Sequence, residues 1–424
     1  MTPNTRPTFF ALLLCAAYSC SRTTTKPQPQ PQPTPPPVDT TLSVNLMYPN
    51  SDTADYGSSY ELIITEPGGK ILLDTIAAYN VAVVAKMTTA KAVLNVATVV
   101  QGITFSYYGV NIYTSVQPAN WQVMPGNPVP LSYPIATTAQ VVYTNTPTYD
   151  PNSTHFSSLP AVTSAGVGIL YDNTNDVVKI NYPGLSNDDL YILYPPLGLY
   201  SYQPVNTSYD TISLAQMDTT AKVFYSMPAQ YTLATTFLTG YPDTTDFSKY
   251  QSLYLYWSNQ TLADLQYPPQ SVVPFQKYAL DVDASTSTEY INYLTFASTP
   301  PTGTLTLPFP VTPIYTLNAT ANDSFSVTFS QQPTDYGTVW VAGDIGVTII
   351  APPDSTQIKA LPLLTSLNSK LLQGRTLNTL AIQNFTYESV FGVNYNSYFQ
   401  HQTNSNQMNT KPFASDLHYT KNNP

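Results

Sequence analysis

The amino-acid sequence predicts an all-β protein, with two or three antiparallel β-sandwich domains of immunoglobulin-like architecture after a Pro-rich linker. Three observations predict this fold class. Tyrosine is abundant at 34 residues, and with the frequent Thr and Val it suits a half-buried pleated surface. Only 9% of the residues are charged while 42% are hydrophobic, so the chain is expected to fold. Short alternating segments recur without helical patterns between them.

The first forty residues differ from the rest. The apolar run at 9–18 has about half the length that crosses a bilayer as a helix, which is typical of a signal-peptide core. Ala17-Tyr18-Ser19-Cys20 follows, and then a Pro/Gln-rich segment at 27–37. Ala17 and Ser19 also fit an ordinary secretory cleavage site, which would leave a secreted protein with Cys20 at its start.

The segment that ends at Cys20 resembles the signal peptide of bacterial lipoproteins, and the resemblance covers about the first twenty residues. It implies that residues 1–19 are removed and that Cys20 is lipidated. The protein would then contact the membrane through its lipid and work at the cell envelope, in the outer membrane of a Gram-negative bacterium. Residues 20–40 would form a linker, because alternating Pro-Gln favours extended polyproline II.

The next predicted unit is a β-sandwich over 41–130. Leu42, Val44 and Leu46 alternate with polar residues, as in a half-buried strand. Strands at 60–65 and 70–74 flank Glu66-Pro67-Gly68-Gly69, a tetrad that suits a type II turn with Gly68 at the position of positive φ. Further strand candidates of this unit are 81–85, 92–100, 103–108 and 110–115.

Two proline clusters, at 118–134 and 300–313, divide the remainder into β-rich units over 131–300 and 301–424. The strand candidates of these units are 177–182, 190–194, 221–225, 253–257, 325–329, 339–342 and 347–350. Leucines spaced by three and four over 361–371 predict one helix, with Gly374 as its stop. The polar stretch 401–424 is interpreted as a frayed tail or one weak final strand.

Charge and cysteine usage exclude several functions. The formal net charge is −10 and no basic run is present, so nucleic acid is not an expected partner. Nothing after Cys20 carries a thiol, because the second cysteine, Cys15, lies in the apolar leader. Disulfides, Cys-ligated zinc and a cysteine nucleophile are therefore not expected in the body of the protein. We also predict no metal and no cofactor.

Candidate catalytic residues are few. His155, His401 and His418 have no metal-ligand spacing, and His401 and His418 are interpreted as solvated residues of the tail. The dense acid clusters at 172–176, 187–189 and 281–283 are interpreted as turn residues, although each could offer oxygens to calcium. A pair of carboxylates for hydrolysis stays an alternative, because its geometry depends on the fold.

Aromatic side chains offer the candidate binding site. In the segment 253–257 a period of two places Tyr254 and Tyr256 on one face and the leucines with Trp257 on the other. Tyr200 and Tyr202 form a similar pair. Exposed in this way, the tyrosines could stack on sugar rings. The alternative is that they cover sheet faces and pack against neighbouring elements.

These patterns predict a lipid-anchored protein of the cell envelope that acts as a binding module for glycans or proteins. A structural or adhesive envelope protein without a small ligand is the alternative, and a carboxylate-dependent hydrolase is a third. Exposed coplanar tyrosines would favour the first, self-association the second, and a cleft with two carboxylates the third.

Overall fold

In the computed structural model the described strands all belong to the part of the chain over Asp39–Pro424. Residues 1–38, with Cys20 among them, lie outside the described residues. The structure describes residues 39–46, 56–79, 81–102, 107–119, 121–122, 139–144, 155–159, 168–172, 177–182, 189–194, 197–204, 209–226, 230–231, 233–244, 250–258, 262–269, 275–286, 288–302, 304–307, 309, 314–321, 324–403 and 415–422.

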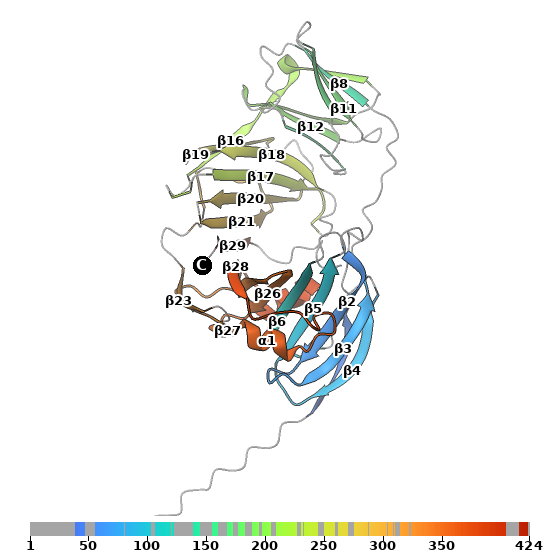
Figure 1. Ribbon diagram of the computed structural model, residues 1–424. Helices are drawn as coiled ribbons and strands as arrows, with labels where there is room; N and C mark the ends of the chain where they lie inside the picture. Colours follow the sequence, from blue (N-terminus) through green and yellow to red (C-terminus); the bar gives the residue numbers. More distant parts are fainter. Residues whose placement is uncertain are drawn as a thin grey trace, which may run out of the picture. The chain divides into compact units, whose positions relative to one another are not determined.

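The described part of the chain is dominated by one mixed sheet of 12 strands, so the all-β prediction is confirmed (Figure 1). Listed in spatial order, the strands of this sheet are β18 (Gln251–Ser258), β17 (Leu233–Tyr241), β20 (Lys277–Ser285), β21 (Glu289–Ala297), β29 (Ser415–Asn422), β28 (Ala381–Val390), β25 (Asp335–Ala342), β26 (Ile345–Ala351), β6 (Tyr108–Val116), β5 (Leu94–Gly102), β2 (Tyr56–Thr65) and β3 (Ile71–Ala78). All neighbours are antiparallel except β26 and β6, which are parallel.

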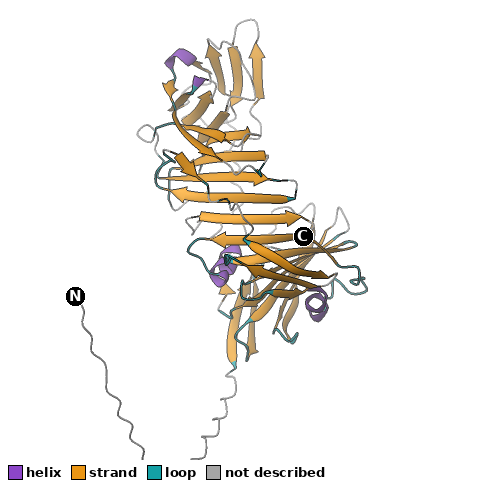
Figure 2. Ribbon diagram, turned by 90° about the vertical axis from the view of Figure 1, so that its left-hand side faces the viewer, coloured by secondary structure: helices purple, strands orange, loops and turns teal. Residues whose placement is uncertain are grey.

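The final described strand, β29, lies in the middle of this sheet (Figures 1 and 2). It pairs antiparallel with β21 on one side and with β28 on the other. On the β21 side, the sheet consists of four strands that all come from residues 233–297. On the β28 side, it consists of strands from residues 56–116 and from residues 335–390. β29 therefore joins two groups of strands that have no other pairing between them among the described residues.

A second layer covers one face of the β3–β2–β5–β6 part of the sheet. It contains β4 (Val83–Thr89), β1 (Thr40–Leu46) and β7 (Trp121–Gln122), paired in that order. Leu42 and Val44 of β1 pack against Leu62 and Ile64 of β2, because alternate residues of each strand face inward. The α2 helix (Tyr395–Thr403) also contributes Phe399 to this core. The arrangement is a β-sandwich.

The opposite face of β2 and β5 is covered by the short α1 helix (Ala360–Ser366) and the loop after it. Glu61 of β2 is fully buried there and accepts hydrogen bonds from the backbone N–H groups of Lys370 (2.8 Å) and Leu371 (3.2 Å) and from the Ser369 hydroxyl. A buried carboxylate with three donors is well satisfied, so Glu61 fixes the loop on the sheet.

The remaining strands form four small sheets. Listed in spatial order, the first contains β10 (Gly168–Asp172), β11 (Val177–Tyr182), β8 (Ala139–Thr144) and β14 (Tyr209–Ser213); the second contains β15 (Asp218–Thr219), β13 (Leu199–Pro204), β12 (Asp189–Tyr194) and β9 (His155–Leu159); the third contains β19 (Leu262–Tyr267), β16 (Ala221–Ser226) and β22 (Thr304–Thr306); and the fourth contains β23 (Tyr315–Ala321), β24 (Ser324–Phe329) and β27 (Gln357–Lys359). A 3-10 turn, η3, spans Leu214–Gln216.

The predicted boundaries near 130 and 300 do not separate compact units. Strands from all three predicted units share the 12-stranded sheet, and one hydrophobic cluster extends from Ile63 to Tyr419. Proline clusters interrupt strands locally, but strands on either side of them can still pair in space. The chain crosses from one sheet region to another instead of completing one domain at a time.

The predicted hairpin at 60–74 is present as β2 and β3, but its turn differs from the prediction. The positive φ, +84°, belongs to Gly69 and not to Gly68, and the Gly69 N–H donates to the Glu66 carbonyl at 2.8 Å. A type I turn followed by a left-handed residue matches this pattern, which is the usual three-residue hairpin connection. The prediction of a glycine with positive φ in this turn is confirmed, but its assignment to Gly68 is wrong.

The helix predicted over 361–371 is shorter than expected. α1 ends at Ser366, and Asn368 has a positive φ of 49°, which terminates the helix before Gly374 is reached. The second helix, α2, was not predicted. Asn394 caps it, because its side-chain oxygen accepts a hydrogen bond from the Ser397 N–H at 2.9 Å.

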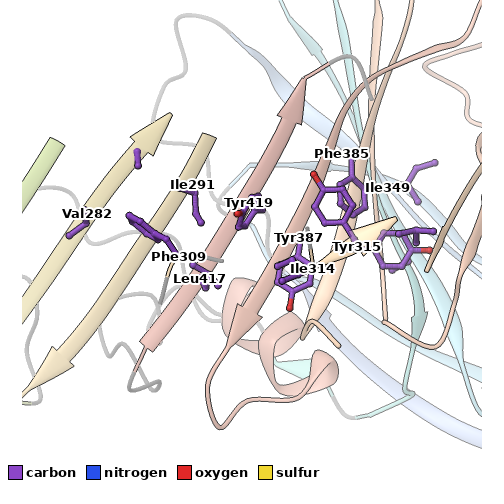
Figure 3. Close-up of a cluster of buried hydrophobic side chains, with 14 of the residues drawn as sticks. Val282, Ile291, Phe309, Ile314, Tyr315, Ile349, Phe385, Tyr387, Leu417 and Tyr419 are labelled. Carbon is purple, nitrogen blue, oxygen red and sulfur yellow. The ribbon is translucent and has the colours of Figure 1, made fainter. Parts of the chain in front are cut away.

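Aromatic side chains fill the core around β29 (Figure 3). Tyr419 packs edge-on against Tyr387 and Tyr315, with ring centroids 6.5 Å and 6.3 Å apart, and its hydroxyl shares a 2.9 Å hydrogen bond with Tyr231. Edge-to-face pairs are a favourable geometry for aromatic rings. One side chain of β29 therefore contacts three other segments of the chain.

Replacing Tyr419 by Ala should destabilise the whole fold. The change removes a buried ring from the strand that joins the two strand groups, and we expect a loss of about 3–5 kcal/mol in the free energy of unfolding, measured in urea. Lys421→Ala on the same strand is the matched control, because its ion pair with Glu289 is partly exposed and should contribute about 0–1 kcal/mol. Equal effects of the two changes would contradict the central role of β29.

Candidate functional site

A row of polar side chains crosses the middle of the sheet. Strand register places Asp283 of β20 opposite Asn292 of β21, Asn292 opposite His418 of β29, His418 opposite Glu388 of β28, and Glu388 opposite Asp335 of β25. Directly opposed residues share one face of an antiparallel sheet, so these five side chains lie on the same side. We call them the polar row.

Glu388 is the centre of the row. Its Oε2 contacts Nδ1 of His418, and its Oε1 accepts a 2.8 Å hydrogen bond from the Tyr398 hydroxyl on α2. The other ring nitrogen of His418 lies 3.0 Å from the Thr420 hydroxyl. The Glu388 side chain is only 12% exposed, so this carboxylate is shielded from solvent and depends on these partners.

Burial and neighbouring charges move the pKa values of two carboxyls in opposite directions. Burial alone would raise the pKa of Glu388, but the hydrogen bond with His418 and the charge of His418 hold it below its usual range, together with side-chain hydrogen bonding that involves Asp416 and the Tyr398 hydroxyl. Burial, and next the charge of Glu388, raises the pKa of Asp335 well above its usual range. Oδ2 of Asp335 has no hydrogen-bond partner among the described residues. The uncharged form of Asp335 is therefore favoured in the folded protein.

A second polar group continues the row toward β20. The side-chain amide of Asn292 donates to Asp283 at 2.8 Å and also to Asp281, and the Tyr290 hydroxyl donates to Asp283. The interpretation of the 281–283 acids as turn residues is wrong, because both lie in the strand β20. They act as acceptors for side chains of the neighbouring strand.

Thr420, His418 and Glu388 follow one another in hydrogen-bond order, as a hydroxyl, an imidazole and a carboxylate do in acyl-transfer enzymes. Such a group also needs backbone donors for an oxyanion. Thr420 lies in a strand that pairs on both sides, opposite Tyr290 and Thr386, so the backbone around it is committed to the sheet. The geometry therefore supports a structural network.

The described part of the chain contains no group of three or more His, Cys, Asp or Glu side chains that could hold a metal ion. Of the acid clusters considered as calcium ligands, residues 173–176 and 187–188 lie outside the described residues. Asp189 belongs to β12, where it is opposite Leu159 and Pro204.

The candidate tyrosines are not assembled into an exposed platform. Tyr254 and Tyr200 are each 1% exposed and belong to the hydrophobic core, so the expectation that they stand on an open face is wrong. The physical reason is that β18 is covered on both faces at Tyr254, since Leu253 next to it is also buried, whereas Tyr200 of β13 packs against Tyr191 of the neighbouring strand β12, with ring centroids 6.4 Å apart. Period two predicts which residues share a face, but it does not predict which face is solvated.

The second member of each pair gives a different result. Tyr202 is partly buried and packs edge-on against Phe275, with ring centroids 6.1 Å apart. Tyr256 lies in β18 opposite Thr236, and its side chain is outside the described part of the structure. Packing, the alternative reading of these tyrosines, therefore holds for Tyr254, Tyr200 and Tyr202.

The three histidines have different positions. The interpretation of His418 as a solvated tail residue is wrong, because this side chain is half-buried on the central strand β29. The alternation of Leu417 and Tyr419 around it was the one available signal for that strand. His155 is in β9 opposite Leu193, and His401 is in α2, and the side chains of both lie outside the description.

In the residues that the structure covers, no helix has the length and apolar character needed to cross a membrane.

Comparisons with known proteins give no family. No family model matches the chain, and no curated protein matches it. One similar solved structure is the crystal structure of a tetra-tandem repeat in the extending region of a large adhesion protein. It is 11% identical, covers 82% of this chain and 94% of that chain, and has a TM-score of 0.12. So low a TM-score supports no conclusion about the function of this chain.

The polar row should make two substitutions respond oppositely to pH. Because the pKa of Asp335 is raised on folding, the folded state keeps its proton while the unfolded state releases it, so stability falls as pH rises through that window. Because the pKa of Glu388 is lowered, its contribution is lost as pH falls through the folded pKa. As pH rises, the free energy of unfolding of Asp335→Asn should therefore increase relative to that of the wild type, and that of Glu388→Gln should decrease relative to it.

Urea unfolding at about pH 3 and about pH 7 measures both effects, and each variant should change by about 1–3 kcal/mol relative to the wild type between these conditions. Asp344→Asn is the control, because its ion pair with Arg375 is 40% exposed on both sides and should respond less. A pH response of the same sign for Asp335→Asn and Glu388→Gln would contradict the assigned directions.

Proposed function

We propose that this protein is a structural, adhesive β-module displayed at the cell envelope, anchored by a lipid on Cys20 and separated from the membrane by the Pro/Gln-rich segment. The observation that carries the proposal is the 12-stranded sheet in which β29 joins two strand groups. A module with this sheet resists separation of the two strand groups. An adhesive protein needs such resistance, because it must stay folded while it holds cells or surfaces together.

The strength of the connection comes from backbone pairing on both sides of β29. The strand is paired over Ser415–Lys421 with β21 and over Asp416–Asn422 with β28. To leave the sheet it must break both ladders and expose Leu417 and Tyr419, which belong to the continuous core. Burial of apolar area contributes about 25 cal/mol per Å², so the side chains add to the resistance of the backbone.

The polar groups of the described residues favour this function over catalysis. Within the polar row Asn292 donates to Asp283 and His418 contacts Glu388, and the Thr420 hydroxyl lies against His418 in a strand with two neighbours. Tyr254 and Tyr200, two of the candidate residues for stacking on sugar rings, are buried and are not accessible to a glycan. A module that recognises proteins or surfaces through its backbone edges and apolar side chains needs neither feature.

The location rests on the sequence before the described residues. Ala17-Tyr18-Ser19-Cys20 followed by alternating Pro-Gln supports lipid attachment and an extended spacer. The net charge of −10 disfavours direct adsorption to anionic headgroups, so the lipid is the means of membrane contact that we propose.

Cys20→Ser should release the protein from the membrane. Loss of the thiol removes the acylation site, so the full chain is expected to move from the membrane fraction to the soluble fraction or medium of the expressing cells. Immunoblotting of the fractions measures this, and Ser21→Ala is the matched control that should stay in the membrane fraction. Retention of Cys20→Ser in the membrane fraction would show that the lipid assignment is wrong.

Display of the full chain should increase adhesion of the cells without any glycan ligand. We expect cells with the wild-type protein to bind protein-coated surfaces or one another more than cells with Cys20→Ser, in a washing assay. Binding of the purified chain to a glycan array that is lost in Tyr256→Ala would instead favour a glycan-binding module. Equal adhesion of wild-type and Cys20→Ser cells would contradict the proposed function.

A further inference from the structure

The 12-stranded sheet has two edges, and they differ. At one edge, β18 lies against β9 and β12 of a neighbouring sheet. At the other edge, β3 pairs with β2 on its inner side and also lies against β4, which follows it in the chain, but no described strand forms a backbone ladder with its outer side. An unpaired edge presents a row of backbone N–H and C=O groups to any extended chain.

The side chains of β3 are suited to association. The strand reads Ile-Leu-Leu-Asp-Thr-Ile-Ala-Ala over 71–78, with no proline and no lysine. Ile71 and Ile76 are 37% and 49% exposed, and Val81 and Val84, which follow the strand, are 55% and 78% exposed. Asp74 is the one charged residue of this strand, and its Oδ2 forms an ion pair with Nζ of Lys370 at 2.9 Å. The edge is therefore apolar and locally uncharged within an acidic protein.

The backbone of β3 has a defined outward register. The carbonyl oxygen of Asp74 accepts a long hydrogen bond, 3.5 Å, from Lys370 Nζ, so it can be reached from outside the β2–β3 ladder. In an antiparallel strand, alternate residues direct both backbone groups to the same side. Asp74 and Ile76 then present their N–H and C=O groups to the outer side of β3, while Thr75 and Ala77 face β2; the Ala78 carbonyl accepts a hydrogen bond from the Val81 N–H at 3.4 Å.

We infer that β3 is a self-association edge, at which two copies of this chain pair antiparallel through β3 around a two-fold axis at Thr75. This register pairs outward residues with outward residues, with Asp74 of one copy opposite Ile76 of the other. Leu73 then lies opposite Ala77, and Thr75 lies opposite Thr75 of the second copy. Like charges are kept apart, and both copies use the same surface, as a two-fold interface requires.

A second copy is the occupant that these features favour. A register centred on Asp74 would place two carboxylates opposite each other, which is destabilising, whereas the register centred on Thr75 forms a Thr–Thr pair. The pairing also covers Ile76 in both copies at once, and it removes the open edge by continuing the sheet. The inference deepens the proposed structural function, and its biological meaning rests on that function.

Cysteine cross-linking tests the register directly. The full chain with Cys15→Ser and Cys20→Ser retains no thiol, because it contains only those two cysteines. Thr75→Cys in this background should form a disulfide-linked dimer on oxidation, since Cα atoms of a non-hydrogen-bonded pair lie about 4.5 Å apart, within the range of a disulfide. A doubling of apparent mass on a non-reducing gel is the expected shift.

Three controls make the result specific. Lys86→Cys, exposed on β4, should stay monomeric under the same oxidation. Leu73→Cys alone should also stay monomeric, whereas Leu73→Cys with Ala77→Cys should cross-link. Ile76→Lys added to Thr75→Cys should abolish the dimer without changing the circular dichroism spectrum, because Ile76 is half exposed.

Monomeric Thr75→Cys with a native spectrum, or equal dimer formation by Lys86→Cys, would overturn the inference. If Thr75→Cys does not fold, light scattering of the thiol-free chain compared with its Ile76→Lys variant gives the same decision: a dimer that becomes a monomer supports β3 pairing, and equal masses overturn it. These measurements use unanchored protein, so failure of β3 pairing is distinguishable from failure of the envelope function, which the adhesion of displaying cells tests.

Discussion

The structure depends on the insertion of β29 between β21 and β28. One face of this strand carries Leu417 and Tyr419 into the aromatic core, and the other carries His418 into the polar row. The two faces have different effects. Apolar burial supplies most of the stabilisation, whereas the contact between half-buried His418 and largely buried Glu388 contributes less because it removes the Glu388 carboxylate from water. The pairing of polar groups instead disfavours other registers of β29, since a shift by one residue would bury His418 in the core.

The polar row also contains an unfavourable element. Asp335 is buried opposite Glu388, and one of its oxygens has no hydrogen-bond partner in the part of the chain that the structure describes. Two neighbouring carboxylates that are shielded from solvent cannot both stay charged without a large free-energy cost. His418 contacts Glu388 and stabilises its charged form, so the protonated form is favoured for Asp335. Glu61 on β2 shows the contrast, because its buried carboxylate accepts hydrogen bonds from three donors in the loop after α1.

The composition of the chain is well matched to this architecture. Its many tyrosines have a ring that can be buried and a hydroxyl that can find a partner, as Tyr395 does with the Thr114 carbonyl at 2.8 Å and Tyr398 with Glu388. With so few charged residues, the chain relies on such hydroxyls for specific polar contacts. A protein built in this way offers its surroundings few charges, some apolar side chains and, at β3, an edge with which no described strand pairs.

Local patterns were enough to predict the all-β class, the strands at 177–182 and 325–329 within a residue, and the hairpin at 60–74, because alternation and turn chemistry depend on neighbouring residues. Three features are visible in the folded chain alone: Tyr254 and Tyr200 are buried, His418 contacts Glu388 from 30 residues away, and β29 lies inside the 12-stranded sheet. Which face of a strand is solvated and which strand it pairs with depend on segments distant in the sequence, and no local period encodes them.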